Sequence, residues 1–202
     1  MSAVAKAFVD DVFRGDFQFQ GTISGQQTNR MTGAAMTDAA STTISGTIKA
    51  KGNDVALSMT RRSGTETATL DAIAVGKTVY TRTNGSPWDS YERDPTGANS
   101  LLAPLCMPDV VDKGLGTFRG RRLHKLMPTT YPTVSPFSLG RNSGITTQSL
   151  QITFWAANDG TPAGMTVQQS YRMDTGASTL TVESTVDYTF DRLSGVTITA
   201  PV

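Results

Sequence analysis

The chain has 202 residues, of which 17% are charged, and a formal net charge of +1 at pH 7. This near-neutral balance gives no electrostatic case for nucleic-acid binding, and the single cysteine, Cys106, excludes an intrachain disulfide or a thiolate metal cluster. No apolar run reaches the roughly 18 residues of a membrane-spanning helix, and no linker divides the chain, so we expect one domain over residues 1–202.

The first segment has the spacing of an amphipathic helix. Val4, Phe8 and Val12 recur at helical intervals, Lys6 and Asp10 take the opposite side, and Gly15 follows where a helix ends. The opening residues show no export signal. We therefore expect either a cytosolic protein or a chain that begins after a removed export segment.

Alternation of apolar and polar residues predicts strands through the first half of the chain. The segments end at Gly- or Asn-containing turns, and Asn84-Gly85 is the strongest hairpin signal. Gln26–Ala40 alternates only weakly and predicts one or two strands with a loose connection. The predicted strands are Phe17–Ile23, Ile44–Ala50, Val55–Met59, Thr67–Val75 and Val79–Thr83.

The pattern changes in the middle of the chain. Apolar residues from Leu101 to Val111, interrupted by prolines and followed by Gly114, predict short helical turns. Arg119–Met127 then predicts extended chain, and Pro128–Gly144 predicts a long loop.

The last quarter, Gln148–Val202, predicts an antiparallel meander. In Leu180–Phe190 every second residue is apolar except Ser184, and the residues between them are polar. Turn residues Asn158-Asp159-Gly160 and Asp174-Thr175-Gly176 separate the segments. The whole chain then holds about nine to eleven strands and two helical stretches, which makes it mainly β (α+β). A sheet of this size curls as it twists, and two short helices leave part of its apolar concave face available as a pocket.

Three strings, in this order along the chain, resemble the bacterial periplasmic lipoprotein-carrier (LolA-like) superfamily. They are Ile73–Tyr80 followed by Gly85–Trp88, Phe154-Trp155 followed by Asn158–Pro162, and Tyr188–Phe190 followed by Val196–Pro201. Within that superfamily the chain looks most like the LppX/LprG type of actinobacterial lipoprotein. The resemblance implies an open antiparallel half-barrel of roughly ten strands, capped on its concave face by short helices. It also implies an apolar cavity for acylated lipids or lipoproteins, and export with a lipid anchor on an N-terminal cysteine, but no such cysteine is present.

A cavity for acyl chains needs apolar, adaptable walls. Each methionine by itself is more typical of core filling, but together the methionines favour a lining, because the predicted helices cover only part of the sheet. Six of the eight lie in or beside the predicted walls: Met31, Met36, Met59, Met107, Met165 and Met173. Burying one CH₂ is worth about 0.8 kcal/mol, so a sixteen-carbon chain contributes on the order of 10 kcal/mol. The expected lining residues are Phe8, Val12, Phe17, Phe19, Val55, Leu57, Met59, Leu70, Val79, Leu101, Leu102 and Leu105.

The one charge cluster is Arg119–Lys125. Arg119, Arg121, Arg122 and Lys125 are candidates for contact with lipid headgroups or a membrane surface. The alternative, which we favour, is a solvated edge strand that basic residues protect from pairing.

No constellation predicts catalysis or a metal site. His124 is the only histidine, no Gly-x-Ser-x-Gly elbow accompanies it, and we expect it at the surface of the basic segment. Cys106 among leucines is typical of a buried small hydrophobe. Trp88 and Trp155 are more typical of hairpin packing than of a pocket mouth.

These observations predict a non-enzymatic, extracytoplasmic lipid- or lipoprotein-binding protein without a cofactor, anchored to the membrane in its native full-length form. The expected partners are a lipid or acylated molecule and a membrane surface, with no nucleic acid, and the expected state is a monomer. The alternative is a cell-envelope sensor or protein-interaction module on the same fold, with a collapsed core.

Overall fold

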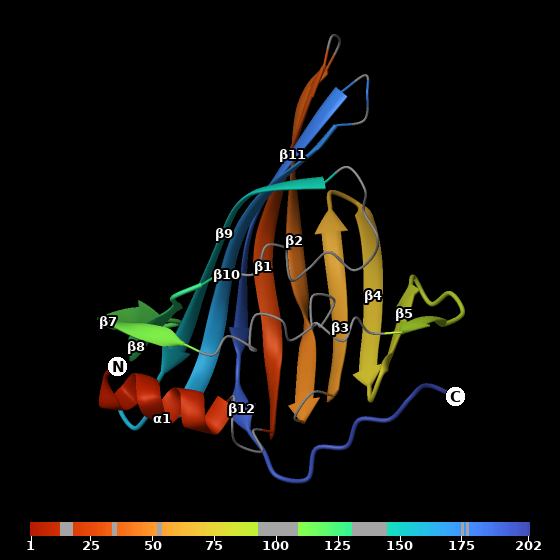
Figure 1. Cartoon of the computed structure of the whole chain (residues 1–202). Coiled ribbons are helices and arrows are strands. Elements are labelled where there is room, and N and C mark those ends of the chain that lie inside the picture. Colours follow the sequence, from red (N-terminus) through yellow and green to blue (C-terminus); the bar gives the residue numbers. More distant parts are fainter. Residues whose placement is uncertain are drawn as a thin grey trace.

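The computed structural model describes residues 1–12, 18–33, 36–51, 54–92, 109–130, 145–174, 176 and 178–202. These residues form one open β-sheet with a helix at one end of it (Figure 1). The long strands β1, β2, β10 and β11 run through its middle, and the hairpins formed by β1 and β2 and by β10 and β11 extend beyond the neighbouring strands (Figure 1).

The sheet has the order β6-β5-β4-β3-β2-β1-β11-β10-β9-β8-β7, with the short β12 paired to β1, and all neighbours are antiparallel. The first and last thirds of the chain therefore meet at its centre, where β1 pairs with β11. The strands are β1 (Gln18–Gly33), β2 (Met36–Lys51), β3 (Asp54–Ser63), β4 (Glu66–Val75), β5 (Thr78–Thr83), β6 (Asp89–Glu92), β7 (Val110–Phe118), β8 (Arg121–Pro128), β9 (Ile145–Ala156), β10 (Pro162–Asp174), β11 (Ser178–Thr189) and β12 (Asp191–Arg192).

Helix α1 spans Ala3–Val12 and is capped by Ser2, whose hydroxyl oxygen accepts from the Ala5 N–H at 3.1 Å. Its apolar side packs on one end of the sheet, where the ring of Phe8 lies 5.2 Å from that of Phe154 in β9. Across the described ranges, no helix has the length and apolarity to cross a membrane.

Most predicted strands are confirmed. Thr67–Val75 and Val79–Thr83 fall within β4 and β5, joined by the predicted turn at Gly76-Lys77. Asn84 and Gly85 adopt φ angles of 51° and 71°, as the predicted Asn-Gly turn requires. The mainly β class and the open antiparallel sheet are therefore correct.

The prediction of helical turns through Val110 and Val111 is wrong, because both residues belong to strand β7. Gly114, predicted to follow a helix, instead has a φ of 87° within an irregularity of the β7–β8 pairing between Asp112 and Leu115. An extra residue in one strand allows it to bend without ending. The earlier part of that predicted segment, 101–108, lies outside the described residues.

The face of the sheet that α1 covers is called the inner face here. Along β2, Thr42, Ile44, Ile48 and Ala50 are buried on it, whereas the residues between them point to the opposite, outer face and are largely exposed. Two inner-face glycines permit close strand approach: a Cβ on Gly25 would lie 2.9 Å from the Val186 Cα, and one on Gly46 would lie 3.0 Å from the Met59 Cα. Glycines at such positions are typical of sheets that bend.

Candidate functional site

The inner face is a nearly continuous apolar surface, because strand register places apolar residues side by side. One row runs from Met59 of β3 across Gly46 of β2 and Ile23 of β1 to Tyr188 of β11. It continues through Met165 of β10 and Phe154 of β9 to Leu126 of β8. Among the described residues, a single hydrophobic cluster therefore joins α1 to eight strands, β1–β3 and β7–β11.

The structure places several predicted lining residues deep in this surface. Phe8 and Phe19 belong to the cluster and are at most 1% exposed. Val55 is in the same cluster and fully buried. Val79 of β5 is also fully buried, and it flanks Ala74 of β4 on the side opposite Val55.

A second group of predicted lining residues forms the margin of the cluster. Leu57 and Met59 of β3 are only half-buried and pack against it, as does Val12 of α1. Leu70 of β4 opposes Met59 and is half-buried too. The remaining predicted residues, Phe17, Leu101, Leu102 and Leu105, lie outside the described residues.

The predicted lining omits much of the β8–β11 half of the inner face. Ile152 and Phe154 of β9, Val167 of β10 and Leu126 of β8 are completely buried in the same cluster. Alternation in β9 and β10 is visible in the sequence, but it does not show which strands stand opposite α1. That placement depends on the pairing of β1 with β11.

The ionisable groups on the inner face include two tyrosines. Burial raises the pKa of Tyr188, which is almost inaccessible within the cluster. Burial also raises the pKa of Tyr171 in β10, while the positive charge of Arg61 in β3 lowers it. Because both pKa values are raised, both phenols stay neutral at neutral pH.

One polar cluster ties α1 to the edge of the sheet. His124 Nδ1 lies 3.0 Å from Asp112 Oδ2, and the Ser2 hydroxyl donates to the same oxygen at 3.0 Å. Burial pushes the pKa of Asp112 up, but hydrogen bonds from the Gly114 N–H, Ser2 and His124 outweigh it, so this pKa lies below its ordinary value. The expectation of a surface histidine is therefore wrong: the His124 side chain is 20% exposed and has a carboxylate partner.

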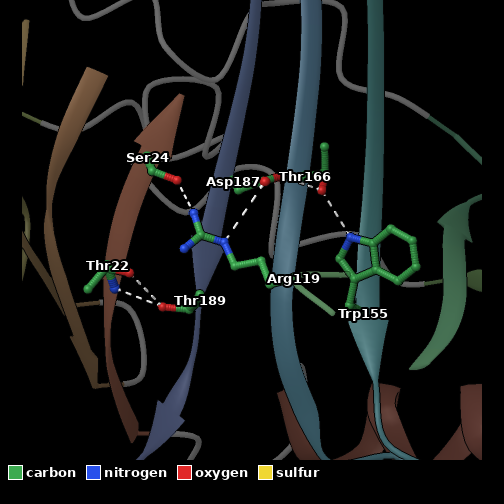
Figure 2. A network of polar contacts seen from close by, with 7 residues as sticks. All are labelled: Thr22, Ser24, Arg119, Trp155, Thr166, Asp187 and Thr189. Carbon is green, nitrogen blue, oxygen red and sulfur yellow. Dashed lines mark hydrogen bonds and ion pairs between the residues drawn. The ribbon is translucent and has the colours of Figure 1, made fainter. Parts of the chain in front are cut away.

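The predicted basic segment lies at the turn between β7 and β8 and in β8 itself. Figure 2 shows Arg119 reaching over the outer face, where it donates to Ser24 Oγ, and its Nε lies 4.0 Å from Asp187 Oδ2. Asp187 also accepts from the Thr166 hydroxyl at 2.7 Å, which in turn accepts from Trp155 Nε1 at 3.0 Å. Arg119 is thus committed to contacts within the chain rather than free for a headgroup.

The other three basic residues differ among themselves. Arg121 and Arg122 are exposed, whereas Lys125 is half-buried opposite Trp155. The alternative of an edge strand is wrong, because β8 pairs with β7 on one side and with β9 on the other. The edge on this side of the sheet is β7.

The two tryptophans pack within the chain, as predicted. Trp155 stacks on Phe118 with ring centroids 5.3 Å apart, and the Arg82 guanidinium lies 4.5 Å from the centre of the Trp88 ring. Within the described ranges, no three His, Cys, Asp or Glu side chains are placed to hold a metal ion.

No protein-family model and no curated protein matches this chain. Among solved structures it is similar to LprF from Mycobacterium bovis, at 15% identity, a TM-score of 0.40, and coverage of 98% of this chain and 96% of that one. It is also similar to a LolA superfamily protein from Nitrosomonas europaea, at 10% identity, a TM-score of 0.31, and coverage of 98% and 96%. The ywiB protein from Bacillus subtilis is similar at 10% identity and a TM-score of 0.34, with coverage of 85% and 93%. One of these three proteins carries the name of the superfamily that the sequence resembles, but at these identities and TM-scores the likeness by itself supports no conclusion.

Proposed function

We propose that this protein binds acyl chains of a lipid or lipoprotein on the apolar inner face of a half-barrel and carries them. The observation that supports the proposal is the margin of the hydrophobic cluster. Leu57, Met59 and Leu150 pack against fully buried neighbours, yet each remains half-buried. Half-exposed apolar side chains beside a closed core are the surface on which a hydrocarbon chain gains the most.

The energy available from such a surface is large enough for binding without a charge contact. At about 0.8 kcal/mol per buried CH₂, partial burial of a sixteen-carbon chain contributes several kcal/mol. Methionine at the margin adds adaptability, because its unbranched thioether fits chains of different shape. A carrier also has to release its ligand. Half-buried contacts along β3 and β4 fit that requirement better than a fully closed pocket.

The proposed location is outside the cytoplasm, with the native full-length protein anchored to a membrane. The resemblance of the three sequence strings to periplasmic lipoprotein carriers supports this location. Fractionation of the source cells, with an antibody against this chain, tests it: we expect the protein in the envelope fraction. Recovery in the cytosol would contradict the proposal.

The experiment that tests acyl binding uses two glutamate variants of the same strand. Leu70→Glu places a carboxylate on the half-buried inner margin, whereas Thr67→Glu places one on the exposed outer face. We expect Leu70→Glu to weaken palmitate binding at least about tenfold, because a charge beside the chain has to be desolvated. Thr67→Glu is expected to bind like the wild type. Equal binding by all three proteins would show that this margin is not the site.

A protein-interaction module is the alternative, and the edge strand β7 favours it. Val111 and Leu115 on this strand are 41% and 49% exposed, and an edge strand can pair with a strand of another protein. Failure of acyl binding together with a loss of partner binding in Val111→Lys would favour this alternative.

A further inference from the structure

A row of polar side chains crosses the apolar inner face in the middle of the sheet. Thr42 of β2 opposes Gln27 of β1, Gln27 opposes Ser184 of β11, and Ser184 opposes Gln169 of β10. The first three are only 3%, 7% and 6% exposed, and Gln169 is half-buried. These four residues are called the polar rung.

The rung is sharply bounded on the side toward α1. The next inner-face row contains Ile44 of β2, Val186 of β11, Val167 of β10 and Ile152 of β9, all buried. In β2, β11 and β10 an apolar inner-face position is followed by a polar one at this level, and in β1 Gly25 is followed by Gln27. Polar residues side by side in four adjacent strands are unusual for packing alone, because valine and isoleucine suit these positions better.

The hydrogen bonding within the rung leaves one group unmatched. Gln27 Nε2 donates to Asn29 Oδ1 at 2.6 Å, one position along β1 on the same face. Ser184 Oγ, in contrast, is the buried side-chain oxygen in the described part of the chain that has no hydrogen-bond partner. A buried hydroxyl without a partner lowers stability. Ser184 is also the only polar residue on its face of the segment from Leu180 to Phe190.

A positive charge reaches the same region from across the sheet. Arg61 of β3 opposes Ile44 on the inner face, and its charge lowers the pKa of Tyr171 in β10. Arg61 lies one inner-face row from the level of the polar rung, because Ile44 and Thr42 are neighbours on that face of β2.

We propose that the polar rung is a subsite for the acyl oxygen at the head of the bound chain, the oxygen of a carboxylate or of an ester carbonyl. Ser184 Oγ donates to this oxygen and so gains the partner it lacks. The chain then runs along the half-buried margin of the cluster, which reaches the rung at Leu150 of β9, the residue that opposes Gln169. This inference rests on the proposed function.

The test compares three sixteen-carbon ligands: palmitate, methyl palmitate and hexadecane. Each displaces the apolar fluorophore N-phenyl-naphthylamine from the full chain, for wild type, Ser184→Ala and the outer-face control Thr185→Ala. We expect Ser184→Ala to weaken the binding of palmitate and of methyl palmitate about fivefold to tenfold and to leave the binding of hexadecane unchanged. Thr185→Ala is expected to leave the affinities for all three ligands unchanged. Arg61→Gln removes the nearby positive charge and is expected to weaken the binding of palmitate alone, because palmitate is the only charged ligand of the three.

A stability measurement separates a ligand group from a structural one. Because Ser184 Oγ has no partner to lose, the ligand-free Ser184→Ala protein is expected to melt at the same temperature as wild type or higher. Should Ser184→Ala fold poorly, Ser184→Cys serves as the second variant, since its weaker donor is expected to bind palmitate less tightly.

The outcomes distinguish this inference from the proposed function. Displacement by all three ligands with equal affinity, or unchanged palmitate affinity in Ser184→Ala, overturns the subsite and leaves acyl binding standing. Loss of hexadecane binding in Ser184→Ala to the same extent as palmitate also overturns it. Failure of every ligand to displace the fluorophore overturns both.

Discussion

The two faces of the same sheet satisfy their polar groups differently. On the outer face the hydroxyl, carboxylate and guanidinium groups pair with one another across strands, as in the chain from Trp155 through Thr166 and Asp187 to Arg119 (Figure 2). Thr22 and Thr189 form a similar pair at 2.9 Å. On the inner face the side chains are mostly apolar, and Ser184 Oγ has no partner among the described residues. The outer-face groups named here have partners within the chain, whereas Ser184 Oγ has none among the described residues, and the proposed ligand would supply one.

The largest expected effect comes from removing a ring that the inner face buries completely. Phe154→Ala is expected to lower the free energy of unfolding by about 3–5 kcal/mol, because it leaves a cavity beside Phe8. Thr185→Ala on the outer face is expected to change it by less than about 0.5 kcal/mol. Urea unfolding measures both. Similar losses for the two variants would contradict the division between the faces.

The next effect concerns the cluster that holds α1 on the inner face. Asp112→Asn is expected to cost about 1–2 kcal/mol at pH 7, because charge-assisted hydrogen bonds from His124, Ser2 and the Gly114 N–H are weakened. The control is Asp109→Asn, since Asp109 accepts through its backbone carbonyl. Unfolding in urea at several pH values provides the measurement.

The stability loss in Asp112→Asn depends on pH, and the lowered pKa of Asp112 gives the sign of that dependence. A carboxylate with a depressed folded-state pKa stabilises the protein above its ordinary value, here 3.8, and loses that contribution as pH falls through the lower folded-state value. The difference in unfolding free energy between wild type and Asp112→Asn is therefore expected to become smaller below about pH 4. A constant difference from pH 7 to pH 2 would show that the carboxylate charge plays no part.

A smaller effect is expected from breaking the outer-face network. Asp187→Ala removes the acceptor of Thr166 and the ion-pair partner of Arg119, at a cost of about 1 kcal/mol for these half-exposed groups. In a Trp88→Phe background, the emission of Trp155 reports on this face. We expect a red shift as the β7–β8 turn loosens. Unchanged emission would mean that Phe118 stacking alone holds Trp155 in place.

The smallest effect on stability is expected from the exposed arginines of the β7–β8 hairpin. Arg121→Gln and Arg122→Gln together are expected to alter the unfolding free energy by less than about 0.5 kcal/mol. If they contact lipid headgroups, the same variant binds anionic vesicles several-fold less well, and the difference disappears at high salt. Vesicle sedimentation at low and high salt checks this. Equal sedimentation at low salt would contradict a headgroup role.

The parts of the fold that the sequence predicted are those in which the two faces differ in polarity. Leu180–Phe190 and Thr67–Val75 alternate clearly, and both are strands. The alternation weakens at Gln26–Asn29, where β1 in fact continues. The reason is that Gln27 and Asn29 point inward and are themselves polar. The least definite strand prediction, at Gln26–Ala40, therefore includes the position where the polar rung crosses β1.

The parts that could not be predicted depend on contacts between distant segments. Val110 and Val111 are adjacent apolar residues and do not alternate, so pairing with β8, rather than local pattern, makes them a strand. The contacts of Arg119 with Ser24 and Asp187 likewise could not be predicted from the sequence, because they depend on β1 and β11 being neighbours. Of the candidate lining, Phe8, Phe19 and Val55 followed from periodicity alone, because each lies on a regular apolar stripe.

Native mass spectrometry of the full chain, incubated with palmitate and desalted, tests the central claim most directly. We predict one population whose mass exceeds that of the protein by one palmitate, and a much smaller bound fraction for Leu70→Glu than for Thr67→Glu. A spectrum showing only unliganded protein at saturating palmitate, or equal bound fractions in the two variants, would contradict the claim that the inner face binds acyl chains.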